Sequence, residues 1–198
     1  MTHTESDLDA AIEIDAEPDD STGEIAEDLS TAMTIPVDAY ISPEYARNER
    51  DRLWRKVWQQ VGRVEEIPEV GSYLTYDILD DSIIVVRTGP DTFAAHHNVC
   101  MHRGRKLIDN PEGAKNATGR ARKSFVCGFH GWTYGLDGAC THIREQDDWK
   151  GKLTPGTTHL APVQVDTWGG WLFVNMDPHC ESLVDYLHPA AKILDPFG

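Results

Sequence analysis

Two short stretches of the chain combine cysteine with histidine: CMHRG at residues 100–104 and CGFHGW at residues 127–132. Each stretch offers one sulfur and one imidazole nitrogen: Cys100 with His102, and Cys127 with His130. Thiolate and imidazole are ligands that proteins provide to zinc and to iron–sulfur clusters. The two stretches therefore predict a metal centre built from two loops.

The spacing of the four ligands distinguishes two kinds of centre. Zinc sites usually pair like ligands, as C-x-x-C or as two spaced histidines, and the C-x-H half departs from that habit. A Rieske [2Fe–2S] cluster takes two cysteines on one iron and two histidines on the other. We therefore predict a Rieske cluster held by Cys100, His102, Cys127 and His130. A zinc site is the alternative.

Around these ligands, the chain resembles the amino-terminal part of the alpha subunit of Rieske non-haem iron oxygenases, the aromatic ring-hydroxylating dioxygenase group. The resemblance covers residues 36–178 and rests on five blocks: residues 67–77, 83–87, 98–104, 127–138 and 168–177. Respiratory-type Rieske proteins carry a further disulfide-forming cysteine in each cluster loop, where this chain has Arg105 and Phe129. The resemblance implies a mainly β fold of stacked antiparallel sheets whose loops bind the cluster.

The segment between the two ligand loops is longer than is usual in that family. It holds 24 residues between His102 and Cys127, and the extra length falls at residues 110–122, which are rich in Gly, Asn and Lys/Arg. Such a composition predicts a surface insertion. Seven Lys/Arg lie between residues 103 and 123 of an otherwise acidic chain, which indicates a docking patch for an acidic electron donor. A solvated insertion without a partner is the alternative.

Charge and cysteine content bound the remaining interpretations. The net charge is −15, and residues 1–30 hold eleven Asp/Glu and no Lys or Arg, so we expect a disordered acidic tail over residues 1–32. The acidic balance disfavours nucleic acid as a partner. The longest aliphatic run, residues 83–86, is too short to cross a membrane, and the amino terminus lacks a secretory signal. Cys140 and Cys180 are left as free thiols, which suits the cytoplasm.

Periodicity predicts a helix followed by strands. A Ser-Pro-Glu start at residues 42–44 and apolar residues at helical spacing predict an amphipathic helix over residues 42–61, within a helical lead-in at 36–62. The Rieske domain is expected at residues 63–180, and residues 181–198 begin a linker to a catalytic domain absent from this chain. Strands are expected as follows: residues 73–79 and 83–87 in a hairpin, then 92–99, 124–126, 160–165 and 171–175.

The oxygen chemistry of the family implies a second metal, a mononuclear non-haem Fe(II) held by two histidines and one carboxylate. The family's H-x4-H pair with a nearby carboxylate is missing among the other histidines: His3, His96, His97, His142, His159, His179 and His188. The segment that starts at Asp185 approaches the pattern but has Ile193 where the second histidine would stand. We therefore assign no catalytic residue to this chain.

The resemblance implies the electron-transfer part of an oxygenase that inserts O2-derived oxygen into an aromatic or other apolar substrate, using NAD(P)H-derived electrons. It implies a reductase as electron donor, with or without a ferredoxin, and a homotrimer or an alpha/beta hetero-oligomer. It also implies that His130 lies where electrons leave, at the interface with a neighbouring subunit. A stand-alone Rieske ferredoxin, with no oxygenase domain, is the alternative function.

Overall fold

The computed structural model describes residues 35–114 and 116–194. The chain divides into two units, residues 1–41 and 42–198, and the described part of the first contains the short helix α2 (Asp38–Ile41). The predicted acidic tail at residues 1–32 lies outside the described residues. The second unit carries both ligand loops.

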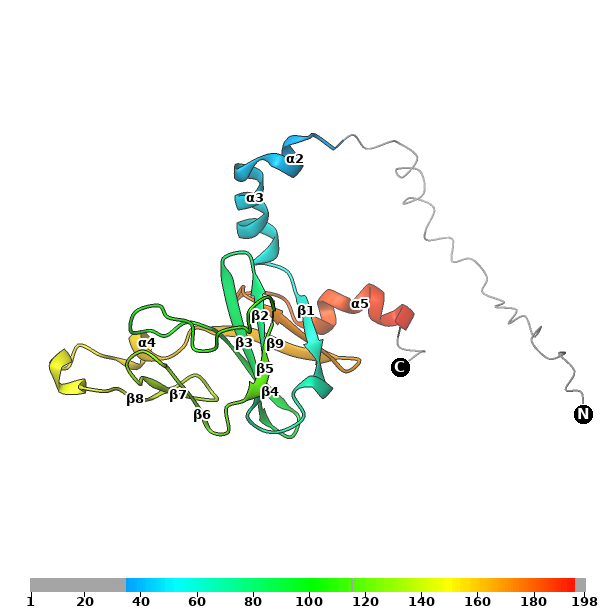
Figure 1. Cartoon of the computed structure of the whole chain (residues 1–198). Coiled ribbons are helices and arrows are strands. Elements are labelled where there is room, and N and C mark those ends of the chain that lie inside the picture. Colours follow the sequence, from blue (N-terminus) through cyan, green and yellow to red (C-terminus); the bar gives the residue numbers. More distant parts are fainter. Residues whose placement is uncertain (1–34, 115, 195–198) are drawn as a thin grey trace, which may run out of the picture. The chain divides into compact units, whose positions relative to one another are not determined.

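Two antiparallel sheets form the second unit (Figure 1). The seven-stranded sheet has the order β1-β10-β9-β4-β3-β2-β5, and the three-stranded sheet has the order β6-β7-β8. The strands of the large sheet are β1 (Gln59–Arg63), β2 (Ser72–Ile78), β3 (Asp81–Gly89), β4 (Thr92–His97), β5 (Thr118–Arg120), β9 (Pro162–Trp168) and β10 (Trp171–Asn175). Those of the small sheet are β6 (Ser124–Val126), β7 (Thr133–Gly135) and β8 (Cys140–His142). The prediction of a mainly β fold with antiparallel sheets is confirmed.

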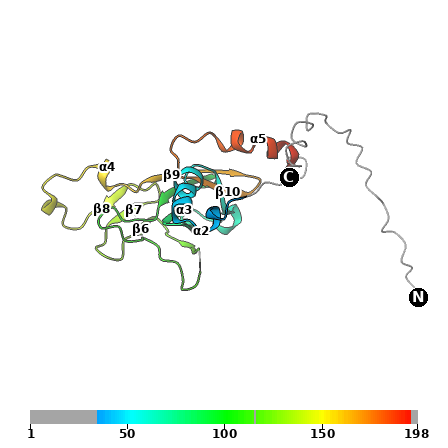
Figure 2. The same cartoon turned by 90° about the horizontal axis from the view of Figure 1, so that it is seen from above.

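Short helices complete the unit. They are α3 (Pro43–Glu49), η2 (Arg50–Trp54), η3 (Val64–Glu66), η4 (Gln146–Trp149), α4 (Pro155–Thr158) and α5 (Leu183–Leu194). The small sheet and α5 lie at opposite ends of the unit in both views (Figures 1 and 2). The ligand loops therefore lie at the end away from α5.

Strand β3 is buried on both faces of the large sheet. Ile83 and Val85 belong to one apolar cluster, and Ile84 and Val86 belong to a second one with Phe125 of β6. All four β3 side chains have no exposed surface. Since successive side chains of a strand point to opposite faces, the apolar run serves both clusters. The small sheet is thus packed against β3 through Phe125, two residues before Cys127.

The predicted hairpin is confirmed with a tighter turn than expected. Strands β2 and β3 pair from Tyr73↔Val86 to Ile78↔Asp81, so that Leu79 and Asp80 alone form the turn. The other four predicted strands correspond to β4, β6, β9 and β10. Four further strands were not predicted: β1, β5, β7 and β8. They are short, with three to five residues each, and the weak periodicity of such segments explains the omission.

The predicted surface insertion is only partly a loop. Its residues 118–120 form β5, which pairs with β2 at the edge of the large sheet. The backbone N–H of Ala117 donates to Oγ1 of Thr75 (2.7 Å), and the N–H of Thr75 donates to the carbonyl of Ala117 (2.8 Å). The carboxyl-terminal half of the insertion is therefore attached to the large sheet.

The predicted helix over residues 42–61 is wrong in its extent. Ser42 caps α3 as expected, because its Oγ accepts from the N–H of Tyr45 (3.3 Å). The helical segment ends with the π-helical η2, and the chain enters β1 at Gln59. Neither α3 nor η2 contains a buried residue. Trp58 and Val61 are buried after the helix, and their three-residue spacing continues the helical pattern although Val61 lies in β1.

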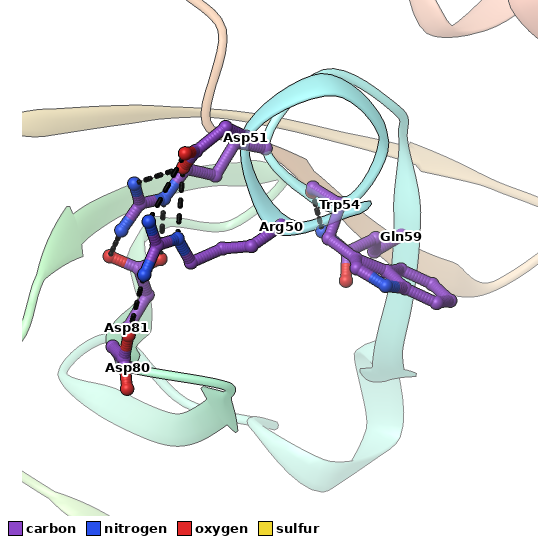
Figure 3. A network of polar contacts seen from close by, with 7 residues as sticks. Arg50, Asp51, Trp54, Gln59, Asp80 and Asp81 are labelled. Atoms are coloured by element: carbon purple, nitrogen blue, oxygen red, sulfur yellow. Dashed lines mark hydrogen bonds and ion pairs between the residues drawn. The ribbon is translucent and has the colours of Figure 1, made fainter. Parts of the chain in front are cut away.

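Ion pairs attach this helical segment to the β2–β3 turn (Figure 3). Arg50 donates to Asp80 (3.0 Å), and Arg55 makes a two-pronged contact with Asp81 (2.8 and 3.2 Å). Asp51 accepts from both arginines. Pairs on the protein surface contribute little each, so this network orients the segment more than it stabilises the fold.

His96 connects the large sheet to the small one. The ring is 4% exposed, its Nε2 lies 3.1 Å from the carbonyl of Leu136 beyond β7, and its Nδ1 has no hydrogen-bond partner among the described residues. Gly138 packs so closely that an added Cβ would lie 2.6 Å from the ring. Burial lowers the pKa of His96, against the smaller opposing effects of the Leu136 carbonyl and the Asp137 charge. The folded state therefore favours the neutral imidazole of His96.

This burial makes stability depend on pH. Because the pKa of His96 is lower in the folded chain than its unfolded value of about 6.5, the unfolded chain binds more protons below that pH. The contribution of the neutral His96 ring to the free energy of unfolding is fully present above pH ~6.5. It is lost as the pH falls towards the folded pKa. We expect the urea midpoint of unfolding to fall on acidification from pH 8 to 5.5, and His96→Gln to flatten that dependence.

A matched control separates His96 from histidines in general. His179→Gln changes an exposed ring on a loop and should retain the slope. Burial also lowers the pKa of His97, so the double variant His96→Gln/His97→Gln should be flatter than either single variant. An unchanged slope in His96→Gln contradicts the assignment.

Candidate metal centre

The two ligand loops have the same backbone geometry. In each, the cysteine N–H donates to a carbonyl five residues later, Arg105 in the first loop and Trp132 in the second, both at 2.8 Å. The cysteine carbonyl accepts from a glycine four residues later, Gly104 (2.9 Å) and Gly131 (3.0 Å). Both glycines have a φ of 73°, which favours residues without a side chain. Two equivalent turns thus present one cysteine and one histidine each.

The structure brings the four predicted ligands together in two pairs, the thiols in one apolar cluster and the imidazoles in ring contact. Cys100 and Cys127 are 2% and 3% exposed and share one apolar cluster with Trp132, Tyr134 and Leu160. The rings of His102 and His130 are half-buried, with centroids 4.6 Å apart and planes at 70°. The sulfurs therefore lie inside the apolar cluster, and the imidazoles lie towards the surface.

Protonation of these side chains suits metal binding. Burial raises the pKa of the Cys100 thiol, and the neighbouring Cys127 thiol raises it further, so a metal has to displace the proton. Burial lowers the pKa of His102, helped by the nearby His130 and Arg103, which keeps its imidazole neutral. Neutral imidazole is the form that ligates a metal.

One buried atom tests whether a cluster fits here. Nδ1 of His130 is buried and has no hydrogen-bond partner among the described residues. A buried polar atom without a partner is rare and indicates an absent ion or water. A Rieske cluster needs two cysteines on one iron and two histidines on the other, and the two turns present this donor set. The donor set fits a two-iron cluster.

Asn98 anchors the first loop. Its side chain is 2% exposed and makes four hydrogen bonds. Oδ1 accepts from the N–H groups of Leu107 and Ile108 (both 3.0 Å), and Nδ2 donates to the carbonyl of Ile108 (2.8 Å) and to Oγ of Ser82 (3.0 Å). These bonds close the loop after the ligands and tie it to the start of β3.

Tyr134 of β7 connects the two loops. Its hydroxyl lies 3.2 Å from Sγ of Cys100 and accepts from the N–H of Met101 (3.1 Å), while its ring has no exposed surface. Burial raises the pKa of Tyr134, so the hydroxyl remains protonated and able to donate to a metal-bound thiolate. Such outer hydrogen bonds tune a metal centre. The sequence interpretation missed this residue, because nothing in the three-residue strand TYG indicates that contact.

The remaining cysteines behave as expected for inert thiols. Cys140 is partly buried and packs against the apolar cluster of the ligands, and burial raises its pKa. Burial also raises the pKa of Cys180. Neither thiol is disposed to ionise, which supports the interpretation that they are not reactive.

The family model of the Rieske [2Fe–2S] domain matches residues 57–168. The chain belongs to the Rieske domain family. It is 30% identical to the carnitine monooxygenase oxygenase subunit of Escherichia coli (strain K12), over 83% of this chain and 42% of that protein. It is 34% identical to the glycine betaine monooxygenase oxygenase subunit of Chromohalobacter salexigens, over 90% of this chain and 38% of that protein.

Solved structures agree with this assignment. The apo form of a quaternary ammonium Rieske monooxygenase matches with a TM-score of 0.73 and 26% identity, over 83% of this chain and 46% of that chain. Naphthalene 1,2-dioxygenase from Rhodococcus sp. matches with a TM-score of 0.71 and 30% identity, over 87% and 38%. The chain spans less than half the length of these relatives. The Rieske family implies a [2Fe–2S] cluster as cofactor, as predicted.

The described residues contain no helix that is both long and apolar enough to span a membrane.

Proposed function

We propose that Cys100, His102, Cys127 and His130 hold the Rieske cluster. The observation that carries this assignment is the pair of equivalent turns, which place two buried thiols beside two half-buried imidazoles. When bound, such a cluster accepts and releases one electron. Around it, Tyr134 donates to the Cys100 sulfur, and Asn98 holds the first loop closed. The His130 imidazole is half-buried and lies towards the surface, which supports its role as the exit towards a neighbouring subunit.

We propose that the protein is the electron-transfer part of a Rieske oxygenase, with residues 63–180 as the Rieske domain and residues 181–198 leading to a catalytic domain. The relatives are oxygenase subunits more than twice as long as the matched part, which supports a mononuclear iron in that further domain. The coding sequence after codon 198 distinguishes this from the stand-alone ferredoxin. An open frame with an H-x4-H pair and a carboxylate supports the oxygenase, and a frame without them supports the carrier.

Two substrate classes compete for the parent enzyme. Resemblance to ring-hydroxylating dioxygenases favours an aromatic or other apolar substrate, and naphthalene 1,2-dioxygenase is 30% identical over this region. The relatives named for carnitine, choline and glycine betaine favour a quaternary ammonium compound, at 30%, 33% and 34% identity. A domain that stores electrons does not select the substrate, so these identities do not rank the two classes. Measuring whether the longer protein turns over an aromatic compound or a quaternary ammonium compound distinguishes the two classes.

The partners follow from the same function. We propose an NAD(P)H-dependent reductase as donor, with or without a ferredoxin, and an oligomer in which His130 faces the next subunit. Four cysteines without disulfide partners suit the cytoplasm. Part of the basic segment is neutralised internally, because Arg105, Lys106 and Arg120 pair with Asp109, Asp77 and Glu69. Arg122 and Lys123 are exposed and make no ion pair within the described residues.

The donor proposal predicts a salt-dependent reaction. Reversing Arg122 and Lys123 to Glu should slow reduction of the cluster by the donor at low ionic strength and leave its visible spectrum unchanged, because electrostatic steering affects encounter and not the cluster. Lys192→Glu, on α5 at the other end of the unit, is the matched control. Stopped-flow rates measured across ionic strengths provide the test. Equal rates for all three proteins contradict this docking surface.

The ligand assignment predicts loss of the cluster. Cys100→Ser and His102→Ala should each yield protein with little iron and acid-labile sulfide, since every iron has only two protein ligands to lose. Cys180→Ser and His142→Ala change the same residue types away from the proposed ligand set and should keep the wild-type content. Iron and sulfide analysis with electron paramagnetic resonance measures the outcome. A full cluster in either ligand variant refutes the assignment.

A further inference from the structure

Trp149 points inward from a segment that is otherwise exposed. The segment follows β8 and contains η4, and its residues 144–148 and 150–152 are exposed to solvent. Three of its apolar side chains pack against the cluster that contains Cys100 and Cys127: Ile143, Trp149 and Leu153. Figure 1 shows this segment in yellow, between β8 and α4. It is therefore attached to the metal centre by three side chains.

Trp149 contacts the imidazole of one proposed ligand. Its ring centroid lies 5.8 Å from that of His102, with planes at 77°, and 5.9 Å from that of Trp132, with planes at 72°. Trp132 stacks on His102 at 5.1 Å with planes at 6°. Edge-to-face and stacked arrangements are the preferred geometries of aromatic pairs. His102 thus packs against two indole rings whose planes are 72° apart, which restricts rotation of the imidazole.

The backbone on both sides of Trp149 adopts an uncommon conformation. Glu145 has a φ of 57° and Lys150 a φ of 49°, in the left-handed region that residues other than glycine seldom occupy. Turn hydrogen bonds accompany it: Asp148 N–H to the Glu145 carbonyl (3.1 Å) and Lys150 N–H to the Asp147 carbonyl (3.1 Å). Such strain persists where surrounding contacts determine the conformation. Between Glu145 and Lys150 in the sequence, Trp149 is the side chain that packs against the apolar cluster of Cys100 and Cys127.

Trp149 also forms one wall of a recess beside the proposed ligands. The recess has a volume of about 340 Å³. Its lining combines four charged side chains with the imidazoles of His102 and His130 and the indoles of Trp132 and Trp149. Because Trp149 lies between the exposed segment and His102, its removal would open this side of the metal centre to water.

We propose that Trp149 is a positioning residue for the cluster: it holds the His102 imidazole and keeps water from that side. The proposal rests on the ligand set proposed above. A Rieske cluster with two thiolates and two neutral imidazoles is neutral when oxidised and negative when reduced by one electron. Water stabilises the charged form more than the neutral one. Loss of Trp149 therefore raises the reduction potential and eases release of iron.

Three variants of the cluster-loaded chain test this. Trp149→Ala should raise the midpoint potential, alter the g-values of the reduced cluster and speed transfer of iron to a chelator several-fold. Trp149→Phe keeps an aromatic ring against His102 and should return all three measurements towards wild type. Trp54→Ala is the matched control, because Trp54 is a partly exposed indole of η2 whose carbonyl bond to Gln59 survives the change.

The outcomes separate this proposal from the ligand assignment. A wild-type chain without a Rieske resonance signal refutes the ligand set. A wild-type signal that Trp149→Ala changes no more than Trp54→Ala overturns the role of Trp149. If Trp149→Ala does not take up a cluster, Trp149→Leu replaces it, because leucine keeps apolar bulk without a ring. Wild-type potential, g-values and iron release in Trp149→Leu then overturn the proposal, and rescue by phenylalanine alone supports it.

Discussion

Residues 83–86 of β3 are buried on both faces of the large sheet, and the position of the proposed metal centre depends on this burial. Each such aliphatic side chain contributes on the order of 2 kcal/mol. One face closes the core of the large sheet, and the other receives Phe125 of β6. The second ligand loop begins two residues after Phe125. The first begins after β4, which pairs with β3, so that one strand positions both loops.

Apolar packing brings the loops together, and polar contacts orient them. The amide of Asn98 closes the first loop with four hydrogen bonds, and the hydroxyl of Tyr134 links that loop to the strand that follows the second. Since neutral hydrogen bonds contribute about 1 kcal/mol each, their effect lies in geometry more than in stability. They hold the sulfur of Cys100 and the turn around it where the partner loop can complete the ligand set.

The parts of the structure that the sequence predicted are those in which residue type determines the role. Cysteine and histidine at C-x-H and C-x-x-H spacing have few uses other than metal binding, and the alternating hairpin of β2 and β3 has a clear period. The predicted helix is too long because the three-residue spacing of Trp58 and Val61 continues the helical pattern into residues that form β1. The sequence predicts a loop where β5 forms, because the three residues TGR have no strand signal of their own.

Residues whose roles arise from contacts distant in sequence were missed. Tyr134 acts on Cys100 across the interface between the loops, and Trp149 reaches His102 from beyond β8. A faint signal existed for Trp149, a single indole within the polar run REQDDWKGK at residues 144–152. An isolated large apolar residue in a charged segment indicates an inward contact, although the sequence does not identify the partner.

We propose that two equivalent turns supply two thiolates and two imidazoles to one [2Fe–2S] cluster. Pulsed electron–nuclear double resonance on the reduced chain, labelled with 15N-histidine, distinguishes such a cluster from a centre without histidine ligands. We expect strong coupling to two histidine nitrogens. Coupling to no histidine nitrogen, or a colourless chain that contains zinc, would contradict it.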